Sequence, residues 1–229
     1  MIDIIKIDKL NFSLCDLVLL NDLYSQINGI FNEYLSRNKI TLFDIDIRRK
    51  FLFVGPYGTG KTMAALALAK ELKLPAYMIA DCGSIHEIFE IFSRETGVYI
   101  FDAGYKHFVE NEALLNSLKF EASNSLIFFE TRYSRICEYS CFFDDIIYFS
   151  RPTKENIRDK LEDILSPYLD DINVLDNLSG MAYENEFGFV DVVKICNIVL
   201  RKMIMRDSKL VDKELLCNMF AKLAKEREK

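Results

Sequence analysis

The chain has 229 residues, half of them apolar and 28% charged, which is typical of a folded globular protein and excludes disorder as its main state. Its formal net charge of −6 offers no general attraction for a polyanion, so nucleic acid is disfavoured as a partner. No apolar run reaches the roughly 18 residues that span a bilayer, and residues 1–6 lack the apolar segment of a signal peptide. Six scattered cysteines without a CxxC pair indicate reduced thiols and a cytoplasmic location.

The first element in chain order is an amphipathic helix within residues 16–37, where leucine, isoleucine and phenylalanine recur at intervals of three and four. Short apolar runs without polar alternation then predict strands buried on both faces of a parallel sheet. These five strands are expected at residues 50–54, 76–80, 98–101, 126–129 and 146–149. Helical patterns at residues 61–72, 85–94 and 106–120 alternate with them, which predicts an α/β fold built from βαβ units.

The pattern changes after Pro152, where no further strand is expected. Helices are predicted at residues 153–165, 168–178, 190–205 and 212–227. Thr153 is expected to cap the first of these helices, because its hydroxyl can accept a hydrogen bond from a free backbone amide. We therefore predict an α/β domain over residues 1–151 and a small helical domain over residues 152–229.

A phosphate-binding loop follows the first apolar run. Residues 55–62 fit the pattern G-x-x-x-x-G-K-[ST] between a predicted strand and a predicted helix. Glycines let backbone amides converge on phosphate oxygens, and a helix N-terminus adds the positive end of its dipole. Lys61 is expected to reach the phosphates of ATP or ADP, and Thr62 to take one position around Mg²⁺. The predicted nucleotide-binding residues are Gly55, Pro56, Tyr57, Gly58, Thr59, Gly60, Lys61, Thr62 and Met63.

Asp102 is the second candidate ligand of Mg²⁺. A P-loop needs a carboxylate that holds the cation directly or through water, and this carboxylate ends another apolar strand. Asp102 follows the apolar run 98–101 in this way. The alternative is an ordinary surface aspartate at a strand end.

With these motifs, the sequence resembles the AAA family of P-loop ATPases over nearly the whole chain. The resemblance rests on the Walker A segment 55–69, on residues 143–152, and on the turn Gly188-Phe189-Val190-Asp191. It implies a five-stranded parallel sheet ordered 5-1-4-3-2, with a helical lid over residues 152–229. It also implies an ATP-binding protein that works in a homo- or hetero-oligomer with protein partners.

Two groups that the family uses for hydrolysis are absent from the sequence. Ala103 follows Asp102 where the family carries a glutamate that polarises water, and Phe142 stands where the family carries an arginine finger. Loss of a general base lowers turnover by roughly 10²–10⁴, and loss of an arginine finger by about 10³ or more. Residues 82–85 also lack the aromatic pore-loop residue of protein-threading members, which disfavours unfolding activity.

Glu130 and Thr131 stand where the family normally has an asparagine sensor. The family places their strand between the Walker A and Walker B strands, so Glu130 could face the γ-phosphate and replace the missing glutamate. The alternative is an ion pair between Glu130 and Arg132 or Arg135. The predicted catalytic residues are Lys61, Asp102, Glu130 and Thr131, with Thr62 and Asp102 at the metal.

These features predict an ATP-binding AAA-type protein with weak or partner-dependent hydrolysis, acting as a nucleotide-responsive subunit of an assembly. One alternative is a competent homo-oligomeric ATPase with Glu130 as its relocated base. Another is a structural subunit that is indifferent to turnover.

Overall fold

The computed structural model describes residues 3–10, 13–17, 21–81, 95–102, 124–132 and 141–227. The chain divides into two compact units, which we describe one at a time. The first comprises Met1–Gly55 and Gly60–Phe149, and the second comprises Pro56–Thr59 and Ser150–Lys229. The functional assignment of residues 1–151 to a nucleotide-binding domain and of residues 152–229 to a lid stays a prediction.

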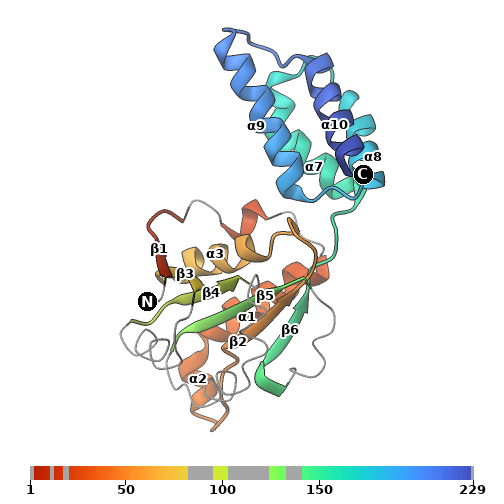
Figure 1. Cartoon of the computed structure of the whole chain (residues 1–229). Coiled ribbons are helices and arrows are strands. Elements are labelled where there is room, and N and C mark those ends of the chain that lie inside the picture. Colours follow the sequence, from red (N-terminus) through yellow and green to blue (C-terminus); the bar gives the residue numbers. More distant parts are fainter. Residues whose placement is uncertain are drawn as a thin grey trace. The chain divides into compact units, whose positions relative to one another are not determined.

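The first unit is an α/β structure in which six described strands form one sheet, in the order β1-β3-β4-β5-β2-β6 (Figure 1). The strands are β1 (Asp3–Ile7), β2 (Lys50–Val54), β3 (Ala76–Asp81), β4 (Val98–Asp102), β5 (Leu126–Thr131) and β6 (Asp145–Tyr148). The last five pair in parallel, in the order that the family resemblance implies. The predicted strand count of five was one too few.

The additional strand, β1, pairs antiparallel with β3 at the edge of the sheet. It was missed because it does not have the unbroken apolar run of a central strand. An edge strand pairs on one side only and accepts charged residues, as Asp3 and Lys6 illustrate.

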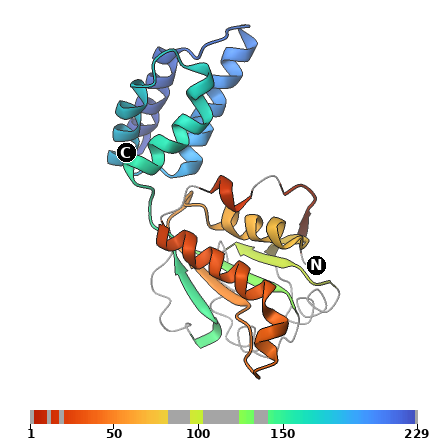
Figure 2. The same cartoon turned by 180° about the vertical axis from the view of Figure 1, so that it is seen from behind.

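The central strands are apolar because helices cover them. All six residues of β5 are buried, as are four of the five in β2. The rings of Phe51 and Phe128 stack at 5.3 Å between neighbouring strands. Helices α1 (Asn21–Leu35) and α3 (Lys61–Leu72) belong to the same core cluster as these rings, and Figure 2 shows α1 in front of the sheet.

Two short helical segments flank α1: a 3₁₀ turn, η1 (Leu14–Asp16), and α2 (Arg37–Thr41). The single helix predicted within residues 16–37 is therefore shorter than expected. Arg48 ties α1 to β6, because its guanidinium lies 2.6 Å from Glu33 and 2.5 Å from Asp145. The helices predicted at residues 85–94 and 106–120 lie outside the described residues.

The regular structure of the second unit within residues 154–227 is helical, with helices α7 (Lys154–Leu165), α8 (Val174–Glu184), α9 (Phe189–Met205) and α10 (Lys213–Arg227). Its own apolar core is built around Leu161, Leu178, Val199 and Phe220. The N-cap prediction for α7 is confirmed, since the Thr153 hydroxyl accepts a hydrogen bond from the Asn156 amide at 3.2 Å.

The helix predicted at residues 168–178 is wrong at its start. A short 3₁₀ turn, η3 (Ser166–Tyr168), follows α7 directly, and α8 begins only at Val174. The segment between them carries Asp170, whose carboxylate pairs with Lys213 of α10 at 2.6 Å. This tertiary ion pair favours a loop where the sequence pattern indicated a helix.

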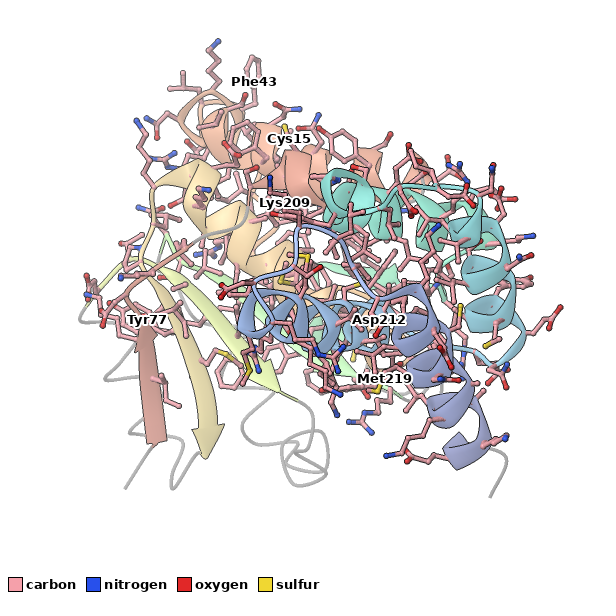
Figure 3. All side chains as sticks on the ribbon, turned by 90° about the horizontal axis from the view of Figure 1, so that it is seen from above. Cys15, Phe43, Tyr77, Lys209, Asp212 and Met219 are labelled. Atoms are coloured by element: carbon pink, nitrogen blue, oxygen red, sulfur yellow. The ribbon has the colours of Figure 1, made fainter. Side chains whose placement is uncertain are left out.

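Helix α10 begins after Asp212, which Figure 3 labels at the turn into the helix. The Asp212 carboxylate accepts a hydrogen bond from the Leu215 amide at 3.0 Å, as an N-cap does. None of the helices in the described part of the chain combines the length and the apolar composition that crossing a bilayer requires.

Candidate functional site

The candidate site begins where β2 ends, one strand in from the β6 edge of the first unit's sheet. Strand β2 pairs with β5 on one side and β6 on the other, and the loop that follows it leads into α3. Gly58 and Gly60 in this loop have φ angles of +77° and +97°. Residues with a Cβ atom are strained at such positive φ angles, so the two glycines allow the backbone to turn sharply here.

Gly55 fixes the start of the loop against two strands. Its amide donates a hydrogen bond to the Thr131 carbonyl at 2.9 Å, at the end of β5. A Cβ atom at this position would overlap the Phe149 carbonyl oxygen, next to β6. Only glycine therefore lets the loop leave the sheet this closely.

Lys61, the first residue of α3, is 8% exposed and folds back over the loop. Its ammonium donates a hydrogen bond to the Gly55 carbonyl at 2.8 Å. The Thr59 hydroxyl donates to the Pro56 carbonyl at 2.9 Å. A buried cation thus lies at a helix N-terminus and is hydrogen-bonded to the first residue of the loop; a helix N-terminus favours negative charge such as that of phosphate oxygens.

Thr62 and Glu130 meet at the edge of this loop. The Thr62 hydroxyl donates a hydrogen bond to a carboxylate oxygen of Glu130 at 2.7 Å. Glu130 lies on β5 with 5% of its surface exposed, and its backbone is in register with Phe53 of β2. The sequence indicated Glu130 as a candidate, but this hydrogen bond was not foreseen; the predicted strand order was the signal that could have suggested it.

Asp102 ends β4 and is in register with Glu130 of β5. The two acidic residues thus occupy neighbouring positions at the carboxyl ends of parallel strands. The side chain of Asp102 lies outside the described part of the structure, as does Ala103.

The tip of the loop contacts the start of α9 within the second unit. The Phe189 amide donates a hydrogen bond to the Gly58 carbonyl at 3.0 Å. A Cβ atom on Gly188 would lie 3.0 Å from the Tyr57 carbonyl oxygen, so the two backbones are close. Asp191 accepts a hydrogen bond from the Gly188 amide at 2.9 Å and holds this turn in place.

The remaining predicted positions are placed as follows. Thr131 is buried beside Gly55, and Met63 is half-buried in the first turn of α3. Phe142, at the position of the family's arginine finger, is 8% exposed. Arg132 is exposed, whereas Arg135 lies outside the described residues, so the proposed ion pair of Glu130 with either arginine stays a prediction.

The donors present fit a nucleotide with Mg²⁺. Lys61 supplies a buried positive charge, the curled loop supplies backbone amides, and the Thr62 hydroxyl lies beside an acidic side chain. Mg²⁺ prefers oxygen ligands, and it is usually held in proteins by one or two carboxylates together with phosphates.

A known family model matches part of the chain. Residues 51–134 match the model of the ATPase family associated with various cellular activities (AAA). This match gives an AAA-type segment over these residues, and the chain is similar to the AAA family. An uncharacterised AAA family ATPase of Sinorhizobium fredii is 24% identical over 212 residues, which cover 80% of this chain and 62% of that protein.

Two further relatives match over shorter stretches. A protein of Methanothermobacter thermautotrophicus, named a 26S proteasome regulatory subunit homologue, is 41% identical over 64 residues, or 23% of this chain and 17% of its own length. A mimivirus protein named a replication factor C small subunit is 28% identical over 162 residues, or 56% of this chain and 44% of its own length. The chain spans less than two thirds of the length of each of these curated relatives.

A similar fold is found in the solved structure of C. elegans PCH-2. It matches with a TM-score of 0.69 over 99% of this chain and 75% of that chain, at 14% sequence identity. At this identity, the likeness concerns the fold alone.

Proposed function

We propose that the chain binds ATP or ADP with Mg²⁺ and acts as a nucleotide-responsive subunit of a protein assembly. The observation that carries the proposal is the loop between β2 and α3, which has positive φ angles at Gly58 and Gly60 and whose first residue, Gly55, accepts a hydrogen bond from the buried ammonium of Lys61. In this proposal, Lys61 holds the phosphates, while Thr62 and Asp102 serve Mg²⁺. Glu130 and Thr131 lie at the γ-phosphate end of the site.

We expect hydrolysis to be weak or dependent on a partner. Ala103 cannot orient water, and the buried ring of Phe142 cannot supply the charge of an arginine finger. A partner that contributes the missing groups would then restore turnover. Support for an assembly comes from the names of two relatives, which describe them as subunits.

The response to nucleotide is proposed to be a population shift, in which the bound nucleotide stabilises one conformation that a partner recognises. The hydrogen bond from the Phe189 amide to the Gly58 carbonyl supports this idea. Because it joins the loop tip to the start of α9, a change in the loop on phosphate binding would reach that helix. We expect the partner to be a protein in the cytoplasm.

The second candidate is a competent homo-oligomeric ATPase in which Glu130 acts as the relocated base. It is favoured by one observation, namely that Glu130 lies within hydrogen-bonding distance of Thr62 and hence beside the proposed metal position. In this case, hydrolysis would need no partner of another kind.

Nucleotide binding can be tested by calorimetric titration of the chain with Mg²⁺ and ATP. Lys61→Ala should abolish measurable binding, because it removes the buried positive charge that is hydrogen-bonded to Gly55 at the start of the loop. Lys70→Ala is the matched control, since it removes an exposed lysine from the same helix and should bind like the wild type. Wild-type affinity in Lys61→Ala, with its helical content unchanged, would refute the proposal.

A further inference from the structure

We infer that Glu130 is a positioning residue for the metal ligand Thr62 and not a catalytic base. This inference rests on the proposed binding of a nucleotide with Mg²⁺. Two carboxylates would then serve the Mg²⁺ site: Asp102 at the end of β4, as expected from the sequence, and Glu130 on β5.

The direction of the Thr62 hydroxyl proton determines whether the Thr62 oxygen can bind a cation. A threonine hydroxyl has one proton to donate and two lone pairs. In this structure the proton is donated to a carboxylate oxygen of Glu130, at an oxygen–oxygen distance of 2.7 Å. Both lone pairs of the Thr62 oxygen are then directed away from Glu130 and can face a cation. The short oxygen–oxygen distance is that of a well-formed hydrogen bond, so Glu130 holds this orientation.

The sheet fixes the position of Glu130. Every residue of β5 is buried, and the strand pairs with β2 and β4 on its two sides. The next residue, Thr131, accepts the amide hydrogen bond of Gly55 at 2.9 Å, so the end of β5 is tied directly to the start of the loop. Glu130 therefore cannot move away from Thr62 as a surface side chain could.

A positioning role explains this contact better than a role as base. A general base has to receive a proton from water in line with the γ-phosphate. One Glu130 oxygen is instead engaged by Thr62, the residue that the loop motif assigns to the metal. Partners that orient a metal ligand in this way typically change metal affinity about 10–100-fold when they are removed.

The test measures how strongly Mg²⁺ improves ATP binding, and it needs no turnover. Calorimetric dissociation constants for ATP are compared in excess Mg²⁺ and in EDTA, and their ratio gives the Mg²⁺ effect. Glu130→Met should reduce this ratio about tenfold or more while leaving the affinity in EDTA close to that of the wild type. Thr62→Val should reduce it similarly, and the double variant no further, because the two residues act as one unit.

Two more variants complete the test. Glu71→Gln is the charge-matched control, because it removes one negative charge from the exposed end of α3 and should leave the ratio unchanged. Glu130→Gln keeps an oxygen that can accept the Thr62 proton but loses the charge, so it should reduce the ratio several-fold. It also keeps the inference testable if Glu130→Met fails to fold, as judged by circular dichroism.

The outcomes separate the two claims. A wild-type ratio in folded Glu130→Met or Glu130→Gln would overturn the positioning role and leave the proposed function standing. Loss of single-turnover hydrolysis in Glu130→Gln with an unchanged ratio would also overturn it, in favour of the base. Absence of ATP binding by the wild-type chain, with or without Mg²⁺, would overturn the proposed function and this inference together.

Discussion

Gly55 is the residue at which the candidate site depends most directly on the absence of a side chain. Its Cα faces the Phe149 carbonyl so closely that a methyl group would overlap the oxygen. Gly29, inside α1, has no such neighbour: a Cβ atom there would meet nothing within 4 Å. The two glycines therefore differ in what an added methyl group would do.

We predict that Gly55→Ala lowers the free energy of unfolding by about 1–3 kcal/mol, because the backbone of the loop or of Phe149 must shift. Gly29→Ala should instead raise it by roughly 0.5–1 kcal/mol, since alanine is the better helix former. Thermal unfolding followed by circular dichroism compares the two variants. Equal shifts for both would contradict the close approach at Gly55.

At the residue scale, the sequence identified the loop well but not the contacts of its side chains. Gly58 and Gly60 have the positive φ angles that the motif predicts, because local backbone chemistry requires glycine there. The Thr62–Glu130 hydrogen bond joins residues 68 positions apart. No local pattern predicts such a bond, because it depends on which strand lies beside β2.

At the scale of elements, α10 is stabilised at its start by a charged cap. The amide of Leu215, and then Arg206, lower the pKa of the Asp212 carboxyl below its usual 3.8. Lys213 similarly lowers the pKa of Asp170. A carboxyl whose pKa is lower in the folded chain stabilises the fold above its unfolded pKa, and this contribution disappears as the pH falls through the folded pKa.

We predict that the wild-type chain loses thermal stability as the pH falls from about 5 to below 4, with Asp212 contributing part of the loss. Asp212→Asn should show a smaller loss, because the amide oxygen still caps the helix and does not titrate. Asp212→Ala should be less stable than both at neutral pH. Melting temperatures at pH 7 and pH 3.5 measure these differences. If wild type and Asp212→Asn lost the same stability between these pH values, the proposed contribution of the Asp212 carboxyl to the pH dependence would be contradicted.

The elements that the sequence predicted well are those whose residues carry a strong local signal. The apolar runs of β2 and β5 and the alanine-rich α3 lie where they were expected. Strand β1 and the late start of α8 were not foreseen, because each depends on a contact with a distant segment: β3 for the strand, and Lys213 for the loop before α8. Tertiary contacts override local preference at such positions.

At the scale of the whole molecule, the open question is how fast the isolated chain hydrolyses ATP. We predict a single-turnover rate below about 0.1 s⁻¹ with Mg²⁺ and ATP, since a typical rate of ~10 s⁻¹ loses at least 10² without a general base. Quenched-flow measurements give the rate, and mass measurements with and without nucleotide give the assembly state.

The two candidate functions predict different results in this experiment. Slow hydrolysis by the isolated chain would agree with a subunit that needs a partner. Fast hydrolysis in a nucleotide-dependent ring would contradict this function and favour the homo-oligomeric ATPase. The Lys61→Ala variant serves as the blank, because it should not bind the nucleotide.

By itself, the sequence determined the α/β class, the parallel strand order through the family resemblance, and the glycine-rich loop at residues 55–62. The class and the loop follow from short-range properties, because apolar runs form buried strands and glycines permit left-handed backbone. Only the tertiary structure decided that Thr62 meets Glu130 and that Gly188 lies against the loop tip. Both contacts join segments far apart in the chain, and their closeness depends on how the strands and helices pack.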